Sequence, residues 1–172
     1  MKNVILIGMP GSGKTRIGKI LAEKLGRPFV DVDEFIFAET GKDSAEHLAE
    51  LGDEKFLEFE AKLVQKIETA NAVIATSGSV PLVDKGIEFL KKNGAVVWLR
   101  PPLEFIEKRV AQRRDGATRI VGAQTKTLAE ILAWRESEYH KHQDLIFVIE
   151  SEMPKEAAAE KLLEFLRAER II

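Results

Sequence analysis

The chain has 172 residues, with 26 basic and 28 acidic side chains and a formal net charge of −2. This length and a hydrophobic content of 45% fit one globular domain of about 100–200 residues, and they exclude disordered, collagen-like and coiled-coil classes. The near-neutral charge lacks the basic bias of a dedicated nucleic-acid-binding protein, and the absence of cysteine excludes disulfides, thiolate zinc sites and iron–sulfur clusters.

The N-terminal segment begins with a short apolar run that glycines interrupt. Residues 4–7 are Val-Ile-Leu-Ile, and Gly8 and Gly11 follow before the run reaches the length of a signal peptide or a membrane span. We therefore expect a cytoplasmic protein with no membrane partner. The run itself is typical of a strand buried on both faces, as parallel sheets require.

Predicted strands and helices alternate along the chain. Strands are expected at residues 4–7, 29–33, 72–76, 95–99 and 145–149. Helices are expected at residues 14–25, 34–39, 44–51, 53–70, 84–91, 101–109, 128–142 and 155–170, with Gly52 separating the third from the fourth. This alternation predicts an α/β fold, a three-layer sandwich around a five-stranded parallel sheet, as one domain over residues 1–172. The polar stretch at approximately 111–124 is expected to form a mobile lid.

The most specific motif lies between the first strand and the first helix. Residues 8–15 read Gly-Met-Pro-Gly-Ser-Gly-Lys-Thr and match the phosphate-loop pattern of a glycine, any four residues, and Gly-Lys-Thr. The glycines let backbone amides surround phosphates, Lys14 reaches the β- and γ-phosphate oxygens, and Thr15 gives a hydroxyl oxygen to Mg²⁺. The loop residues assigned to nucleotide binding are Gly8, Gly11, Ser12, Gly13, Lys14 and Thr15.

Three other nucleotide-binding classes fit this sequence less well. A dinucleotide-binding glycine pattern would need its third glycine at Arg16. The chain also has no Asn-Lys-x-Asp segment to read guanine, which argues against a GTPase. The third predicted strand ends in Thr76-Ser77-Gly78-Ser79, without the acidic residue that a motor-type or signalling ATPase usually carries there.

The acidic residues of the candidate site follow the second predicted strand. Asp31 and Asp33 are separated by one residue, so strand alternation would put both side chains on one face. They also lie at the carboxyl end of the sheet, where α/β proteins bind their ligands. We therefore expect both carboxylates in the ligand crevice.

The early phosphate loop, Asp31-Val32-Asp33 after the second strand and a glycine-centred turn after the third together resemble the shikimate kinases, within the nucleoside-monophosphate-kinase-like group. Residues 40–44, residues 52–56 with Glu60, and Arg135 with Tyr139 also fall in the family's order. The resemblance covers nearly the whole chain. It implies ATP as phosphoryl donor, Mg²⁺ as cofactor, shikimate as acceptor with shikimate 3-phosphate as product, and a place in aromatic amino acid biosynthesis.

The resemblance also implies roles for individual residues. Asp31 would help to hold Mg²⁺ through water, and Asp33 would bind the acceptor hydroxyls and act as the catalytic base. Arg119 would close over the transferring phosphate from the lid, while Arg113 or Arg114 would stack near adenine. The acceptor-binding positions implied by family order, besides Asp33, are Phe56, Leu57, Gly78, Ser79 and Arg135.

The departures from the family pattern lie on the acceptor side. Leu57 stands where the family normally has an arginine that grips the acceptor carboxylate, and Glu60 thereby loses its usual partner. Ser77-Gly78-Ser79 replaces three glycines, and Ile120-Val121-Gly122 replaces the Pro-Leu-Leu after the lid arginine. Loss of the arginine should weaken carboxylate binding by roughly 1.5–3 kcal/mol unless Arg135 or another base compensates.

Three functions follow as hypotheses. The chain is an ATP-dependent shikimate kinase, a kinase of this fold for another hydroxylated small molecule, or a nucleotide-binding regulatory module without transferase activity. Retention of Lys14, Thr15, Asp31, Asp33 and Arg119 favours an active kinase in which Lys14, Asp33 and Arg119 are catalytic. We expect a monomer that binds ATP and a small hydroxylated acceptor and no nucleic acid.

Overall fold

The computed structural model describes residues 2–112, 120–150 and 152–172. The strands are β1 (Asn3–Ile7), β2 (Phe29–Asp31), β3 (Val73–Ala75), β4 (Gly94–Arg100) and β5 (Leu145–Val148). The α-helices are α1 (Lys14–Leu25), α2 (Val32–Thr40), α3 (Ser44–Val64), α4 (Asp84–Lys91), α5 (Leu103–Ala111), α6 (Leu128–His142) and α7 (Lys155–Ala168). A short 3-10 helix, η1 (Val80–Leu82), precedes α4.

The strands form one parallel sheet in the order β2-β3-β1-β4-β5. β1 lies in the centre, with Val4 opposite Val73 of β3 and Ala95 of β4. All five residues of β1 are buried, which explains its unbroken apolar run. The predicted α/β class with a five-stranded parallel sheet is confirmed.

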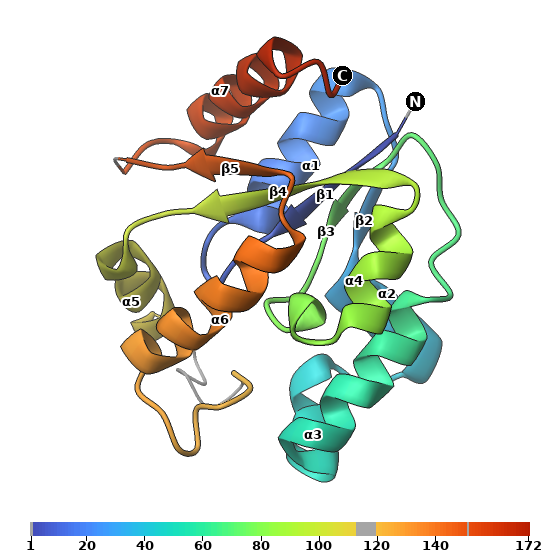
Figure 1. Ribbon diagram of the computed structural model, residues 1–172, viewed down its shortest axis with the longest axis vertical. Helices are drawn as coiled ribbons and strands as arrows, with labels where there is room; N and C mark the ends of the chain where they lie inside the picture. Colours follow the sequence, from blue (N-terminus) through green and yellow to red (C-terminus); the bar gives the residue numbers. More distant parts are fainter. Residues whose placement is uncertain (1, 113–119, 151) are drawn as a thin grey trace.

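Helices cover both faces of the sheet, and alternate residues of β1 serve the two sides. Val4 and Leu6 pack with α1 and α7, while Ile5 and Ile7 pack with α2, α3, α4 and α6. Figure 1 shows this arrangement, with α1 and α7 on one side of the sheet and α2, α3, α4 and α6 on the other. The phosphate loop therefore leaves the centre of the sheet, between the two helical layers.

The second strand is shorter than the sequence pattern predicts. β2 ends at Asp31, and Val32 and Asp33 begin α2 instead of continuing the strand. The Asp31 carboxylate ends the strand because it accepts hydrogen bonds from the backbone N–H groups of Asp33 and Glu34, as an N-cap residue does. The prediction that strand alternation aligns Asp31 and Asp33 was therefore wrong.

The region from 44 to 64 contains the predicted break. Gly52 has φ 72° and ψ 169° and divides α3 into two helical parts. The second part ends at Val64, before the predicted end at residue 70. The Asp53 carboxylate, immediately after the kink, accepts a hydrogen bond from the backbone N–H of Gly122 at 2.9 Å. The kink thus joins α3 to the segment that precedes α6.

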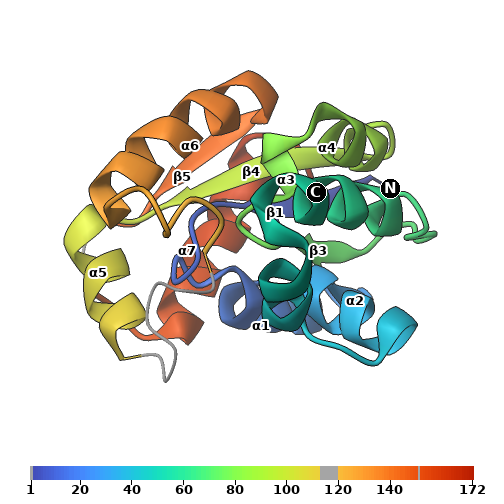
Figure 2. The ribbon, with the colours of Figure 1, turned by 90° about the horizontal axis from the view of Figure 1, so that it is seen from below.

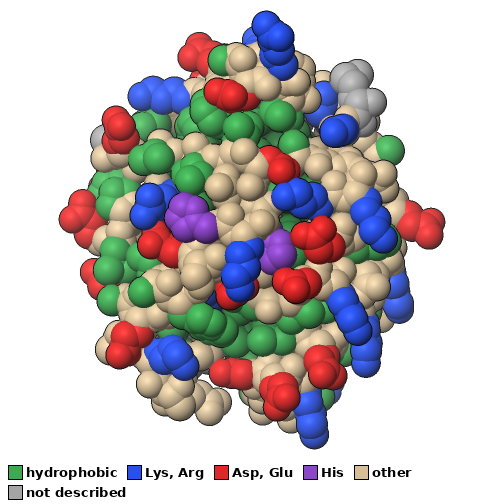
Figure 3. Space-filling model, in the orientation of Figure 1, with side chains coloured by type: hydrophobic (Ala, Val, Ile, Leu, Met, Phe, Trp, Pro, Cys, Tyr) green, Lys and Arg blue, Asp and Glu red, His purple; other side chains and the backbone are tan. Residues whose placement is uncertain are grey.

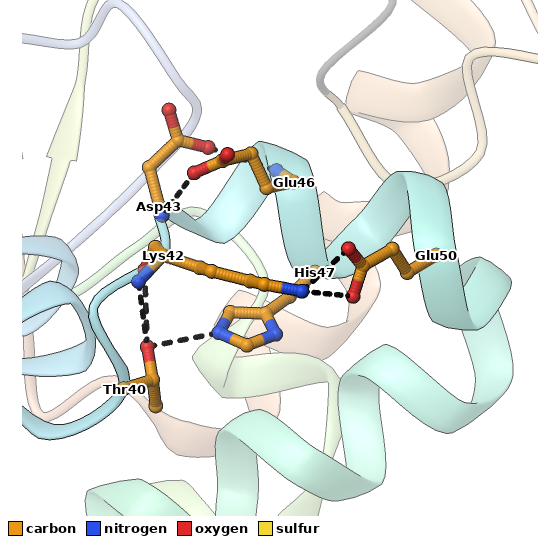
Figure 4. A network of polar contacts seen from close by, with 6 residues as sticks. All are labelled: Thr40, Lys42, Asp43, Glu46, His47 and Glu50. Carbon is orange, nitrogen blue, oxygen red and sulfur yellow. Dashed lines mark hydrogen bonds and ion pairs between the residues drawn. The ribbon is translucent and has the colours of Figure 1, made fainter.

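A polar network fixes the connection between α2 and α3 (Figure 4). Asp43 and Glu46 form a capping box at the start of α3. Lys42 pairs with Glu50, and Thr40 bonds His47 at 2.9 Å. These contacts determine where α3 starts and thereby position its first residue beside the candidate site.

The surface carries both signs of charge in mixture. On the face drawn in Figure 3, basic and acidic side chains are interspersed and apolar atoms occur between them. Within the three described ranges, no helix combines the length and the apolar character needed to cross a bilayer.

Candidate active site

A cavity of about 750 Å³ opens at the carboxyl ends of the strands. This position is expected for a parallel α/β sheet, because the loops that follow the strands converge there. Seen from below, α5 and α3 lie apart with the loop after β1 between them (Figure 2). The predicted site residues that line the cavity are Gly11, Gly13, Lys14, Thr15, Asp33, Phe56, Gly78, Ser79 and Arg135.

The loop between β1 and α1 has the geometry of a phosphate cradle. Gly8 has φ 143°, and a Cβ there would be 2.6 Å from the carbonyl oxygen of Leu99, so only glycine fits. The Lys14 ammonium donates to the carbonyl oxygens of Gly8 and Met9 at 2.7 and 3.0 Å. Ser12 Oγ is buried and has no hydrogen-bond partner in the part of the chain described. A bound phosphate would satisfy such a group.

Thr15 and Asp31 meet at the start of α1. The Thr15 hydroxyl donates to Asp31 Oδ2 at 2.7 Å. Among the described residues, no group of three or more His, Cys, Asp or Glu could hold a metal. A hydroxyl beside a single carboxylate nevertheless fits Mg²⁺, which binds through one or two protein oxygens, waters and substrate phosphates. The two residues are thus suited to a nucleotide-bound magnesium ion.

Asp33 reaches the cavity from the first turn of α2. The Ser44 hydroxyl at the start of α3 donates to Asp33 Oδ1 at 2.6 Å. The Asp31 carboxylate caps the same helix and accepts a hydrogen bond from Thr15, whereas Asp33 lines the cavity. Asp33 can therefore accept a hydrogen bond or a proton from a ligand hydroxyl.

Arg135 and Tyr139 of α6 fix the turn after β3. Arg135 is 1% exposed and donates to the carbonyl oxygens of Gly78 and Val121 at 3.0 and 3.1 Å. The Tyr139 hydroxyl donates to the same Gly78 oxygen at 2.8 Å, and burial raises the pKa of this phenol. Arg135 Nε is buried without a hydrogen-bond partner among described atoms. A buried guanidinium with spare donors is suited to an anion.

Glu60, which the resemblance places on the acceptor side, is a buried member of the cavity lining, and its hydrogen-bond partners are ones that no sequence motif indicates. Ser77 and Ser79 donate hydroxyl hydrogen bonds to its Oε1 at 2.6 and 3.1 Å. Burial, assisted by the Asp33 charge, raises the pKa of Glu60 to about 7, although the serine hydrogen bonds and Arg135 act in the opposite direction. The two serines of the turn after β3 therefore bind this carboxyl group.

Leu57 does not line the cavity. It packs against a small apolar cluster formed by Leu48, Phe56 and Val121. An apolar side chain is suited to that position, which joins α3 to the segment before α6. Leu57 was predicted at an acceptor-binding position, but its side chain is not part of the cavity lining. Phe56, in contrast, belongs to both the cluster and the lining.

Basic residues surround the nucleotide side of the cavity. Arg109 of α5 donates to the carbonyl oxygen of Gly11 at 2.9 Å, and Lys155 of α7 and Arg16 of α1 also line the cavity. Burial and the nearby Arg109 and Arg16 charges lower the pKa of Lys155. Sequence reasoning missed these three residues because no motif marks them and the tertiary fold alone brings them together.

Arg113, Arg114 and Arg119 lie outside the described residues. Their assignment to adenine and to the transferring phosphate stays a prediction.

Comparisons with known proteins agree with this geometry. A family model described as shikimate kinase matches residues 10–167. The shikimate kinase of Thermodesulfovibrio yellowstonii is 36% identical over 168 residues, covering 97% of this chain and 96% of that protein. A solved structure, shikimate kinase from Acinetobacter baumannii in complex with shikimate, has a TM-score of 0.80 at 27% identity and covers 100% of this chain and 96% of that chain.

A second group of relatives is much longer. Threonine synthase-like 1 of Mus musculus is 40% identical over 168 residues, which cover 96% of this chain. The chain spans only 22% of the length of that protein. The match to the shikimate kinase family model runs from the phosphate loop to α7. The alignment with the Thermodesulfovibrio yellowstonii shikimate kinase covers nearly the full length of both chains. The chain therefore belongs to the shikimate kinase family.

Proposed function

We propose that this protein transfers the γ-phosphate of ATP to a hydroxyl group of shikimate, giving shikimate 3-phosphate. The observation that carries the proposal is the convergence of Lys14, Asp33 and Arg135 on one cavity. These residues offer a cation for the phosphate, a base for the acceptor hydroxyl and a cation for the acceptor carboxylate. The relatives named shikimate kinase support this choice of acceptor.

In the proposed mechanism, one side of the cavity binds the phosphates and the other side binds the acceptor. The loop amides and Lys14 hold the β- and γ-phosphates and stabilise the negative charge that moves toward ADP. The acceptor hydroxyl oxygen forms a bond to the γ-phosphorus while Asp33 accepts the hydroxyl proton. The bond from the γ-phosphorus to the β,γ-bridging oxygen breaks, and that oxygen leaves on ADP. Arg135 orients the acceptor through its carboxylate.

The proposed cofactor is Mg²⁺, which Thr15 and Asp31 would hold, Asp31 through water. When bound, the ion neutralises charge on the phosphate oxygens. We further propose that residues 1–172 work as one catalytic unit and as a monomer, with a lid at approximately 111–124 whose Arg119 adds positive charge at the transferring phosphate.

A second candidate function is phosphorylation of another hydroxylated small molecule. The observation that favours it is Leu57, which stands in place of the arginine expected from the family and packs away from the cavity. An acceptor that depends less on its carboxylate would tolerate this change.

A coupled ADP-release assay with Mg–ATP, shikimate and a panel of other alcohols tests the proposal. We expect turnover with shikimate, and a loss of about 10²–10⁴-fold in Asp33→Asn and of similar size in Lys14→Ala. Circular dichroism of both variants checks that they remain folded. An active Asp33→Asn protein would remove Asp33 from the role of base.

The remaining outcomes separate the alternatives. Turnover with another alcohol but none with shikimate, or shikimate turnover only in Leu57→Arg, would favour the second candidate function. Nucleotide binding without turnover on any acceptor would favour a regulatory module.

A further inference from the structure

The acceptor side of the cavity contains a buried carboxyl group that the proposed reaction does not use. Glu60 is 1% exposed yet contributes to the cavity lining between α3 and the turn after β3. Its hydrogen-bond partners in the described ranges are the hydroxyl groups of Ser77 and Ser79, with no basic side chain among them. The two hydroxyl groups also lie 3.1 Å apart, so the three side chains form one compact cluster.

The charged and titratable groups around Glu60 come from two neighbouring helices. Asp33 of α2 disfavours the ionised form of Glu60, and Arg135 of α6 favours it. Tyr139 of α6 is neutral and donates its hydroxyl to Gly78. Burial is the largest influence, so the pKa of Glu60 is about 7 and both protonation states occur near neutral pH.

The charge balance of the acceptor side depends on which state is present. Leu57, three residues before Glu60 on α3, carries no charge and packs among Leu48, Phe56 and Val121. Beside an anionic acceptor, an ionised Glu60 would add a repulsion in a cavity wall of low dielectric constant. A protonated Glu60 removes this repulsion and offers an O–H donor.

We propose that Glu60 is a specificity-determining residue of the acceptor site. Ser77 and Ser79 hold its carboxyl group in place, and an anionic acceptor binds when this carboxyl group is protonated. A bound proton on Glu60 thereby compensates for the absence of a basic side chain at position 57. The proposal rests on the proposed function, because shikimate is the carboxylate that supplies the negative charge.

The test measures the KM for shikimate at saturating Mg–ATP from about pH 6 to about pH 8.5, with Glu60→Gln as variant. The wild-type KM should rise about tenfold over this range, because a repulsion of this kind readily reaches a tenfold change in affinity. Glu60→Gln should keep a low KM that does not change with pH. Glu58→Gln, which alters an exposed carboxylate of the same helix, is the matched control and should follow the wild type.

Two further variants shift the pH midpoint in opposite directions. Replacing both serines (Ser77→Ala with Ser79→Ala) removes hydrogen bonds that favour the ionised form, so the midpoint of the KM increase should move to higher pH. Leu57→Arg adds a cation one helical turn from Glu60, so the midpoint should move to lower pH. A purely structural role of the cluster would change stability but would not move the midpoint.

A wild-type KM that does not depend on pH, or an equal dependence in Glu60→Gln, overturns the proposal. If the wild type does not turn over shikimate, the proposed function fails, and calorimetric binding of shikimate to the ADP-bound protein over the same pH range decides the role of Glu60. Affinity that falls with rising pH in the wild type but not in Glu60→Gln supports that role. Any other binding result overturns it.

Discussion

Gly78 lies where the phosphate loop and α6 approach the turn after β3. A Cβ at this position would be 2.6 Å from Pro10 Cδ and 2.7 Å from Nη1 of Arg135. The Gly78 carbonyl oxygen accepts hydrogen bonds from both Arg135 and Tyr139. The absence of a side chain therefore permits the nucleotide side and the acceptor side of the cavity to meet.

We expect Gly78→Ala to destabilise the protein by about 1–3 kcal/mol, because the added methyl group overpacks a site whose neighbours are held in place. The displaced Arg135 should also raise the KM for shikimate. Gly86→Ala is the control: its Cβ would be 3.5 Å from Ala61 Cα, an ordinary contact, and alanine favours the helix there. Urea denaturation measures both effects, and similar unfolding midpoints for the two variants would contradict the argument.

Among the elements, the junction of β2 and α2 is a boundary that the sequence pattern placed wrongly, because β2 ends at Asp31 and α2 begins at Val32. Residues 29–33 alternate between apolar and acidic side chains from Val30 onward, which favours a strand. The competing signal was Asp31 followed three residues later by Glu34, a spacing typical of a helix start. The capping hydrogen bonds of Asp31 outweighed the strand pattern, and consequently Asp33 projects from a helix.

The kink of α3 rests on a backbone conformation that only glycine adopts readily. Gly52 has φ 72° and ψ 169°, and an added Cβ would meet nothing within 4 Å. Gly52→Ala and Gly52→Asn should therefore each cost about 1–3 kcal/mol through backbone strain alone. At Gly41, whose φ of 74° and ψ of 3° are left-handed helical, asparagine should cost less.

Chemical denaturation of the Gly52 and Gly41 variants, with amide exchange at Gly122, checks this expectation. Exchange at Gly122 should become faster in the Gly52 variants, because its N–H bonds to Asp53 directly after the kink. An asparagine that is equally well tolerated at both glycines would show that the backbone at position 52 is not strained.

For the molecule as a whole, the layer order, the parallel sheet and the phosphate loop could be predicted, because short segments of the sequence determine each of them. Apolar runs mark buried strands, and the loop motif has a fixed spacing. The contact between Glu60 and Ser77, which are 17 residues apart, and the approach of Lys155 to Gly13 depend on tertiary packing. No periodicity or motif encodes such contacts, so they could not be foreseen.

The stability of the whole chain should depend on pH through Glu60. Folding raises its pKa from 4.5 to about 7, so between these values the folded protein holds a proton that the unfolded chain has released. Raising the pH through this window therefore favours unfolding, by up to about 3 kcal/mol, and the loss is complete above the folded pKa.

Urea denaturation at several pH values measures this linkage. Glu60→Gln should gain stability relative to the wild type as pH rises through the window, whereas Glu58→Gln, at an exposed position, should keep a constant difference. A constant difference for Glu60→Gln as well would refute the linkage.

The packing of α7 against α1 has a consequence for synthesis on the ribosome. The apolar face of α1, with Ile17 and Leu21, is covered by Leu162 and Leu166 of α7, the element that follows all others described. At translation rates of about 5–20 residues per second, the helix behind the phosphate loop stays uncovered for on the order of ten seconds in a nascent chain. Nucleotide binding should therefore arise late in synthesis, after residues 155–168 have left the ribosome.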